Sequence, residues 1–269
     1  MSELMGLSVV LPAYNEEDNI VPLLEDALAE LEKLRPHLHQ VCRALELGNL
    51  SQDDTSEKPA VSYEIIVVND GSRDETGKRA DEMAQRHPEL IRCLSHETNL
   101  GYGAALRRGF DAARYPLVFY TDSDRQFSIG DLRYFLPHIV EHDLVVGFRV
   151  YRFDPLLRLF LSWGYNRLVS LLFRVRVRDV DCSYKLMRRE VLESIDLETN
   201  DFFIDTELVA RARRWNFRIF EKGVKHYPRQ AGESSLRPSH IPRTLNTVFR
   251  MWWRIHFGHW SPKGKMKRQ

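Results

Sequence analysis

Two aspartates, Asp122 and Asp124, stand two positions apart directly after the apolar segment 117–121. Carboxylates this close repel each other unless a cation neutralises them. Their hard oxygen atoms suit Mg²⁺ or Mn²⁺, ions that commonly bridge to the phosphates of a substrate. An ordinary Asx turn at the end of a strand is the other interpretation of this pair. The spacing therefore predicts a candidate divalent-metal site next to a phosphate-bearing substrate.

Two further polar loops, at 12–18 and 69–76, follow the first two apolar segments of the chain. The ring of Tyr14 in the first loop can stack on a nucleobase, and a carboxylate in either loop can accept the imide N–H of uracil or guanine. Helix capping, for example by Asn15, explains either loop when it is taken alone. Three such loops in succession favour a nucleotide site.

Short apolar segments alternate with helical patterns along the first half of the chain. We expect buried strands at 7–11, 64–68, 91–95, 117–121 and 144–147, and helices near 20–34, 75–87 and 101–113. Strands buried on both faces and separated by helices predict a mostly parallel α/β sheet. Ligands bind such sheets beyond the carboxyl ends of the strands, so the three polar loops are expected to meet there. The segment 36–62 is expected to be an inserted loop with room for a short helix.

The composition excludes several classes of protein. Of 269 residues, 43% are hydrophobic, which suits a sizeable core and argues against a disordered or collagen-like chain. The three cysteines lack the spacing of a disulfide framework or a zinc site, so a reducing compartment is expected. The segment Gly101–Gly103 has Leu106 where a dinucleotide-binding motif needs its third glycine, and it follows the third strand. This departure argues against a Rossmann oxidoreductase.

Charge is distributed unevenly along the chain. There are 39 basic and 38 acidic residues, yet no Asp or Glu follows Glu233, whereas eight Lys or Arg do. An acidic body with a basic tail predicts an anionic partner, either nucleic acid or an anionic membrane surface. The segment 241–260 interleaves Trp and Phe with Arg, and a helix expected at 155–174 has a wide apolar arc. Both segments suit the headgroup region of a membrane, although aromatic, basic segments also stack on bases.

We expect two parts, a catalytic domain at 1–236 and a basic, aromatic, membrane-interfacial tail at 237–269. No stretch of about 20 residues is free of charge, so a membrane-spanning helix is not expected. Residues 1–6 lack a basic start and a long apolar run, so no signal peptide is expected. These features predict a cytoplasmic protein that binds peripherally to the cytosolic face of a membrane.

Several motifs together resemble one family. The chain is similar to the family 2 inverting glycosyltransferases of the GT-A fold, and within them to the polyprenyl-phosphate (dolichol-phosphate) mannose and glucose synthases. The matching segments are 10–16, 67–74, 99–105, 121–127, 147–149 and 179–185, with Arg229, Gly232, Ser234 and Ser235. The resemblance covers about residues 7 to 236 and implies a GT-A (Rossmann-like) sheet.

The resemblance implies a role for each group of polar residues. The nucleotide would be held by Pro12, Tyr14, Glu16, Asp70, Asp122 and Ser123. A Mg²⁺ or Mn²⁺ ion would be held by Asp122, Asp124 and Gln126. The phosphates of donor and acceptor would face Arg149, Lys185, Arg229 and Ser235. Cations at these positions stabilise the charge that grows on the departing nucleoside diphosphate.

The chain departs from the family pattern at four places. Asn69 stands where an aspartate is common, and Arg125 stands inside the metal motif where a small or apolar residue is usual. The segment 36–62 has no counterpart in the family pattern. The pair of hydrophobic carboxyl-terminal spans that many relatives carry is also missing from this sequence.

The chemistry of the acceptor decides whether a general base is needed. A sugar hydroxyl requires one, and Asp205 or Glu207 are the candidates, although both also suit the start of a helix at 205–214. A lipid phosphate is already an anion near pH 7, since its second pKa lies at about 6 by analogy with phosphoserine. The many basic residues favour a phosphate acceptor. The resemblance implies that Asp122, Asp124 and Arg149 are catalytic, and Asp205 joins them as the candidate base for a hydroxyl acceptor.

The expected function is metal-dependent, inverting transfer of a hexose from a nucleotide-diphosphate sugar, GDP-mannose or UDP-glucose, to a polyprenyl or dolichyl phosphate. The first alternative is a family 2 transferase that acts on a glycan or other hydroxyl acceptor in cell-surface polysaccharide synthesis. A distant alternative is a nucleic-acid-binding or scaffold protein without enzymatic activity. The expected partners are the donor, the lipid acceptor and an anionic membrane surface, without nucleic acid, and with room for a membrane-anchored partner or a homo-oligomer.

Overall fold

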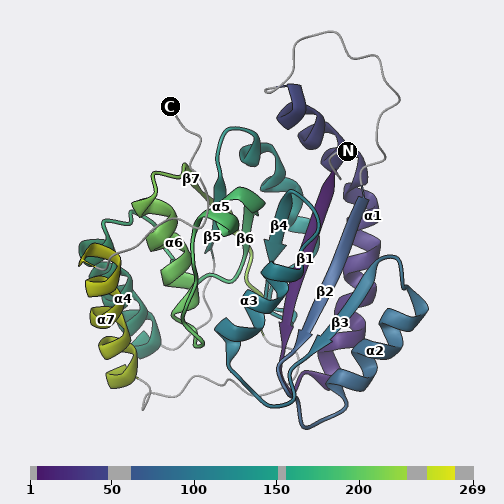
Figure 1. Ribbon diagram of the computed structural model, residues 1–269, viewed down its shortest axis with the longest axis horizontal. Helices are drawn as coiled ribbons and strands as arrows, with labels where there is room; N and C mark the ends of the chain where they lie inside the picture. The colour runs from purple at the N-terminus through teal and green to yellow at the C-terminus, as the bar shows by residue number, and fades with distance from the viewer. Residues whose placement is uncertain (1–4, 48–61, 151–155, 229–240, 258–269) are drawn as a thin grey trace.

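Seven strands form one sheet in a computed structural model that describes residues 5–47, 62–150, 156–228 and 241–257 (Figure 1). The strands are β1 (Gly6–Ala13), β2 (Ser62–Asn69), β3 (Ile91–Ser95), β4 (Leu117–Tyr120), β5 (Leu144–Arg149), β6 (Lys185–Arg188) and β7 (Ile219–Val224). Their order is β3-β2-β1-β4-β6-β5-β7. Only β6 runs antiparallel to its neighbours in the described sheet. The mostly parallel sheet expected from the sequence is confirmed.

Helices cover both faces of the sheet. They are α1 (Glu17–Leu47), α2 (Thr76–Arg86), α3 (Tyr102–Ala112), α4 (Leu156–Phe173), α5 (Arg189–Ser194), α6 (Ile204–Arg214) and α7 (Ile241–Phe257), with short 3₁₀ helices η1 (Ile129–Tyr134) and η2 (Leu136–Val140). Successive side chains of a strand point to opposite faces. Val9 and Leu11 of β1 therefore pack with α1, η1 and η2, whereas Val10 packs with α3 in a second core.

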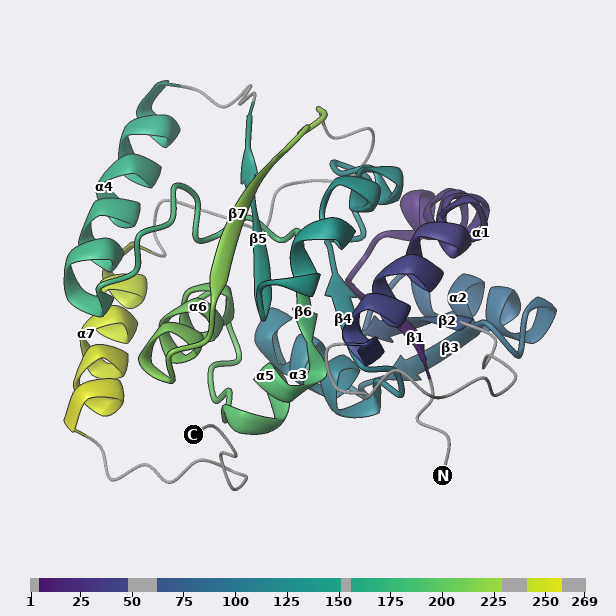
Figure 2. The ribbon, with the colours of Figure 1, turned by 90° about the horizontal axis from the view of Figure 1, so that it is seen from above.

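Helices α4 and α7 form the outer layer of the second core. Both contact α6 and each other, and they lie side by side at the end of the molecule away from β3 (Figure 2). Their bounds agree closely with the amphipathic segments expected at 155–174 and 241–260. Among the described residues, no helix is both long enough and apolar enough to span a bilayer.

The expectation of a loop from residue 36 onward is wrong for its first part. Helix α1 continues through Pro36 to Leu47. A proline inside a helix removes one backbone hydrogen bond. Here the apolar stripe goes on beyond it, because Leu38, Val41 and Cys42 are all buried in the same core as Leu34. The burial of this stripe outweighs the local cost, and the rest of the segment, 48–61, lies outside the described residues.

The register of the sheet brings the three polar loops to one edge. Ala13 at the end of β1 is paired with Asn69 at the end of β2, and Val10 is paired with Tyr120 at the end of β4. The chain leaves all three strands on the same side, since parallel strands end at the same edge of a sheet. The loops after β1, β2 and β4 therefore meet as expected.

Candidate active site

The loop after β4 is fixed to the loop after β1. The Ser123 hydroxyl donates a hydrogen bond to the Pro12 backbone oxygen at 2.8 Å, and both Ser123 and Asp124 are buried. Ser123 thus holds the two aspartates at the carboxyl edge of the sheet. The Tyr14 side chain in the loop after β1 is 38% exposed, so its ring is accessible, and the nucleobase contact stays a prediction.

Asp122 lies at the centre of a polar network. Its Oδ1 accepts a hydrogen bond from the Tyr102 hydroxyl at 2.8 Å, and its Oδ2 accepts one from the Ser183 hydroxyl. Burial, followed by the nearby Asp124 carboxylate, raises the pKa of Asp122 to about 7. A carboxyl group held in this environment gains from a bound cation, because the cation would offset both burial and repulsion.

Gln126 is the third residue of the predicted metal site. Its backbone N–H donates to Asp124 Oδ1 at 3.1 Å, and its Nε2 donates to the Tyr227 backbone oxygen at 3.1 Å. These bonds leave the amide oxygen as the atom of Gln126 suited to a cation. Within the described residues there is no group of three His, Cys, Asp or Glu side chains arranged for a metal. Two carboxylates and one amide suit Mg²⁺ or Mn²⁺ when donor phosphates supply further oxygens.

The loops after β1 and β2 are joined by hydrogen bonds. Asn15, in a left-handed conformation with φ of 54°, donates its N–H to the Ser72 hydroxyl and accepts the Arg73 N–H at its side-chain oxygen. The Glu16 N–H donates to the Thr76 hydroxyl at 2.8 Å. Asn15 therefore bridges the two loops, whereas the sequence suggested only a helix cap.

Asp70 is buried and its carboxylate is occupied by protein groups. Its oxygens accept hydrogen bonds from the backbone N–H groups of Leu100 and Gly101, each at 2.9 Å, and one lies 2.7 Å from His96 Nδ1. The backbone is closely packed at Gly101, where an added Cβ would lie 2.2 Å from the Asn200 backbone oxygen. These contacts favour a supporting role for Asp70 at the start of α3.

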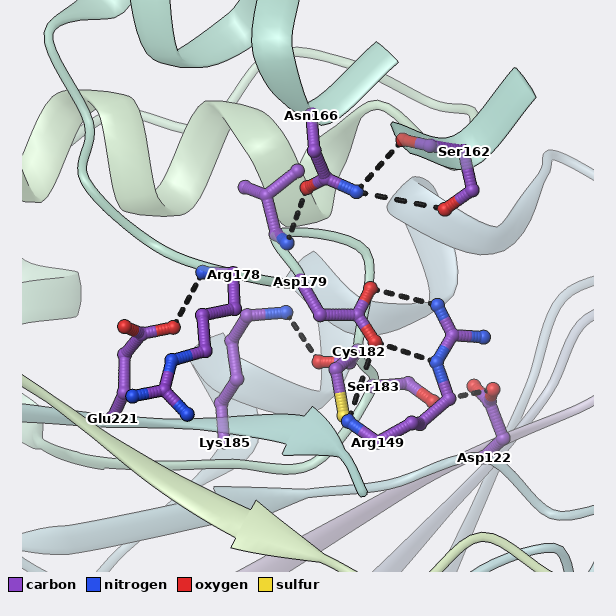
Figure 3. A network of polar contacts seen from close by, with 11 residues as sticks. Asp122, Arg149, Ser162, Asn166, Arg178, Asp179, Cys182, Ser183, Lys185 and Glu221 are labelled. Carbon is purple, nitrogen blue, oxygen red and sulfur yellow. Dashed lines mark hydrogen bonds and ion pairs between the residues drawn. The ribbon is translucent and has the colours of Figure 1, made fainter. Parts of the chain in front are cut away.

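Arg149, at the end of β5, forms a bidentate ion pair with Asp179 (Figure 3). Its Nε and Nη2 lie 2.6 and 2.7 Å from the two carboxylate oxygens. Burial lowers the pKa of Arg149, but hydrogen bonds to Asp179 and the attraction of its charge outweigh burial and raise it. The guanidinium group is therefore charged and held in one orientation by Asp179, which lies four residues before Ser183.

Lys185 and Asp205 lie below the surface of the site. Lys185 is fully buried and donates hydrogen bonds to the Cys182 backbone oxygen, at 2.6 Å, and to Asp205. The Tyr120 hydroxyl donates to the same Asp205 oxygen. The two residues neutralise each other. This placement favours a supporting role, rather than the phosphate contact and catalytic role expected from the sequence.

Glu207, the other candidate base, is also engaged. It is fully buried, and it accepts hydrogen bonds from the backbone N–H groups of Glu198 and Thr199 and from Arg211 Nε at 2.7 Å. A carboxylate whose two oxygens are engaged in this way has no room for an acceptor. Glu207 lies in the first turn of α6, but it does not cap the helix: it joins the helix to the backbone at Glu198 and Thr199, which favours a structural role.

Asp205→Asn is expected to lower the free energy of unfolding by about 3 kcal/mol, because it leaves the buried Lys185 ammonium without its anion. Urea unfolding followed by far-ultraviolet circular dichroism measures this loss. Asp111→Asn, at an exposed position of α3, is the matched control and should change stability little. An Asp205→Asn variant as stable as the parent would show that Lys185 does not depend on this pair.

Several residues that organise the site were not given a role from the sequence. Tyr102 and Ser183 hold Asp122, and Asp179 holds Arg149. All three lie in the matched segments 99–105 and 179–185, so the family resemblance marked their positions. Their contacts could not be predicted, because they depend on the fold. Two other predicted residues, Arg229 and Ser235, lie outside the described residues.

A cavity of about 640 Å³ adjoins the loop after β2 on the α2 side. Asp74, Asp81 and Glu82 contribute negative charge to its lining, against a single positive charge from Lys78. An acidic cavity repels a diphosphate. This cavity is therefore not a candidate for the donor diphosphate.

Comparison with known proteins identifies the family of the chain. A family model described as glycosyl transferase family 2 matches residues 8–196. Glycosyltransferase AglD of Haloferax volcanii is 32% identical over 93% of this chain, which spans only 37% of that protein. The dolichyl-phosphate beta-glucosyltransferase ALG5C of Trichomonas vaginalis is 28% identical over 95% of this chain and 73% of that protein. The polyprenol monophosphomannose synthase of Mycolicibacterium smegmatis is 28% identical over 97% of this chain and 88% of that protein.

The fold also resembles solved structures. Glucosyl-3-phosphoglycerate synthase from Mycobacterium tuberculosis, crystallised with Mn²⁺, UDP and glucosyl-3-phosphoglycerate, superposes with a TM-score of 0.60. The match covers 93% of this chain and 80% of that chain at 20% sequence identity. At this level of identity the likeness concerns the fold alone.

Proposed function

Because the chain belongs to glycosyl transferase family 2, we propose that it transfers a hexose from a nucleotide-diphosphate sugar to a polyprenyl phosphate. The chain is a glycosyltransferase, and the resemblance to that family seen in its motifs is confirmed. Similar proteins include a dolichyl-phosphate glucosyltransferase and a polyprenol monophosphomannose synthase. The identities of the sugar donor, the acceptor and the metal ion are our proposals for this chain.

One observation carries the proposal: a single segment, Arg178–Ser183, binds both Asp122 and Arg149. Ser183 donates to Asp122, and Asp179 orients Arg149. We infer that the donor diphosphate is bound by these two groups together. A divalent ion held by Asp122, Asp124 and Gln126 would supply positive charge to the departing nucleoside diphosphate.

The proposed reaction is an in-line displacement with inversion. An oxygen of the lipid phosphate bonds to the anomeric carbon while the bond from that carbon to the donor diphosphate breaks. The electron pair of the broken bond leaves with the nucleoside diphosphate, whose growing charge Arg149 stabilises. No proton has to be removed from a phosphate anion, so Asp205 and Glu207 can remain in their buried ion pairs.

The alternative, a hydroxyl acceptor, has one observation in its favour. Burial, followed by the charges of Asp205 and Asp179, raises the pKa of Asp181 to about 7, which suits a general base. Asp181 is half-buried and accepts only a long hydrogen bond, 3.4 Å, from the Thr206 hydroxyl within the described part of the chain.

Asp181→Asn distinguishes the two acceptors. Rates of transfer to a short isoprenyl phosphate and to a hexoside would be compared in the parent and the variant. We expect the parent to prefer the phosphate and the variant to retain transfer within about threefold, since no base is needed. Preferential transfer to the hexoside, lost in Asp181→Asn by about 100-fold or more, would support the alternative.

The pKa of Asp122 predicts how metal binding depends on pH. A metal must displace the proton of this carboxyl below about pH 7, so its affinity falls as the pH drops from 8 to 6. The stability of the metal-free protein changes in the opposite direction. The pKa of Asp122 in the folded protein is raised above its unfolded value of about 3.9, so protonation of Asp122 stabilises the fold as the pH falls through 7. We therefore expect Mn²⁺ with UDP or GDP to raise the melting temperature more at pH 8 than at pH 6.

A thermal-shift series tests this prediction, and the nucleotide that stabilises more identifies the base of the donor. Asp122→Asn, which cannot titrate, serves as the control and should remove the pH dependence of the shift. Equal Mn²⁺-dependent shifts at pH 6 and pH 8 in the parent would contradict the assignment of Asp122.

We propose that the protein reaches its lipid acceptor through a surface that we call the α4–α7 face. It comprises the exposed side chains Trp163, Leu171, Phe249, Trp253 and Phe257. On α7, Phe249, Trp253 and Phe257 recur every fourth residue and form one stripe, and the Trp253 and Phe257 rings lie 4.8 Å apart. Trp252 is half-buried and packs against the second core. Exposed aromatic rings with nearby arginines suit an anionic membrane surface.

Trp253→Ala/Phe257→Ala is expected to weaken binding to anionic vesicles about tenfold, because two exposed rings no longer enter the headgroup region. Co-sedimentation at low and high salt measures the effect, and binding of the parent should weaken as salt screens its arginines. Leu100→Ala/Tyr134→Ala removes two side chains of similar exposure elsewhere and should bind as the parent does. Equal sedimentation of the parent with neutral and anionic vesicles would contradict the proposed membrane contact.

A further inference from the structure

The segment Arg178–Ser183 has no helix or strand of its own, although it organises the site. Backbone groups in such a segment need partners from neighbouring elements. The Arg178 N–H donates to Glu221 Oε1 of β7 at 2.5 Å, and Lys185 donates to the Cys182 backbone oxygen. These contacts fix the two ends of the segment.

Asn166 of α4 fixes its middle (Figure 3). The Asn166 side-chain oxygen accepts the Val180 N–H at 3.0 Å, and the side-chain nitrogen donates to the Ser162 backbone oxygen at 2.9 Å. The bond to Ser162 orients the amide, so its oxygen faces Val180. Val180 is buried, and its N–H would lose this partner in a variant without an acceptor at position 166.

Val180 is adjacent to Asp179, whose two oxygens bond to Arg149. A bidentate pair depends on the relative position of two planar groups, so a small displacement of the backbone breaks at least one of its bonds. We propose that Asn166 is a positioning residue for Arg149: it holds the backbone at Val180, and thereby the carboxylate that orients the guanidinium. The inference rests on the proposed function, because Arg149 is the group that meets the phosphates there.

The position of Asn166 connects the site to the α4–α7 face. Trp163 and Leu171 are exposed on the same helix, and the neighbouring Tyr165 reaches the site through a 2.8 Å hydrogen bond to the Thr206 hydroxyl. The helix that carries part of the proposed lipid contact is therefore also the helix that holds Arg149 through one hydrogen bond and one ion pair.

A double-variant cycle tests the role of Asn166. Asn166→Ala is expected to lower kcat for transfer to an isoprenyl phosphate about tenfold, with KM for the donor within about twofold. In an Arg149→Ala background the same change should have almost no further effect, because the two residues act as one unit. Ser170→Ala, one turn along α4, is the matched control. Losses that simply multiply in the double variant would overturn the proposal.

Hydrogen exchange provides a readout that does not depend on activity. Asn166→Ala should speed amide exchange in the segment 174–184 relative to the parent and to Ser170→Ala. Unchanged exchange in Asn166→Ala would overturn the proposal. A parent protein inactive on isoprenyl phosphates would contradict the proposed function alone, and exchange would still decide the role of Asn166.

Discussion

Replacement of Asp124 by alanine is expected to lower the rate of sugar transfer by at least about 10³-fold, because a single carboxylate and Gln126 cannot hold the divalent ion that neutralises the leaving diphosphate. Asp124 is buried at the carboxyl edge of the sheet, and its charge contributes to the raised pKa of Asp122. Removing it should also abolish the part of nucleotide binding that depends on Mn²⁺. Initial rates and thermal shifts with and without Mn²⁺ measure the two effects.

Two controls make the result specific to the metal. Asp124→Asn keeps a carbonyl oxygen and should recover part of the activity, whereas Asp111→Ala, at an exposed position of α3, should behave as the parent. Near-normal turnover of Asp124→Ala in the presence of a chelator would show that the assignment of the metal site is wrong.

Arg149→Ala is expected to lower kcat by about 10²- to 10³-fold, because a positive charge that stabilises the leaving nucleoside diphosphate is lost. Arg149→Lys should recover little, since an ammonium group cannot form two parallel bonds to Asp179. Both variants should also be less stable than the parent, because the buried Asp179 carboxylate loses its bidentate ion pair with Arg149.

Arg149→Ala/Asp179→Ala separates catalysis from stability. Removing both members of the pair also removes the buried carboxylate that Arg149→Ala deprives of its ion pair, so the melting temperature should rise above that of Arg149→Ala. The rate of transfer should stay as low as in Arg149→Ala. Recovery of activity together with stability would mean that Arg149 serves only the fold.

The architecture could be predicted from the sequence because it follows from local patterns. Apolar segments separated by helical periodicity predicted a mostly parallel sheet, and the order of the polar loops predicted that they meet at one edge. The family resemblance rested on short motifs that contain the ends of β1, β2 and β4. The sequence did not predict the direction of β6 or the continuation of α1 past Pro36, since both depend on packing between distant segments.

The roles of single charged residues could be predicted less well. Asp205 and Tyr120 are 85 positions apart, and nothing in either local sequence shows that the two are joined by a buried hydrogen bond. The ion pair between Asp205 and Lys185 is equally hidden in the sequence. Asp70 has the residue type and position of a nucleotide contact, yet its oxygens hold the start of α3. A residue type shows what chemistry a side chain can perform, but its partners depend on the fold.

Mass spectrometry of the lipid after reaction tests the central claim most directly. The full chain would be incubated with Mn²⁺, UDP-glucose or GDP-mannose, and a long-chain isoprenyl phosphate in anionic vesicles, beside a hydroxyl acceptor in the same mixture. We predict that the lipid phosphate gains the mass of one hexose, that the nucleoside diphosphate is released in equal amount, and that Asp124→Ala forms neither product. An unchanged lipid phosphate together with a glycosylated hydroxyl acceptor would contradict the proposed function.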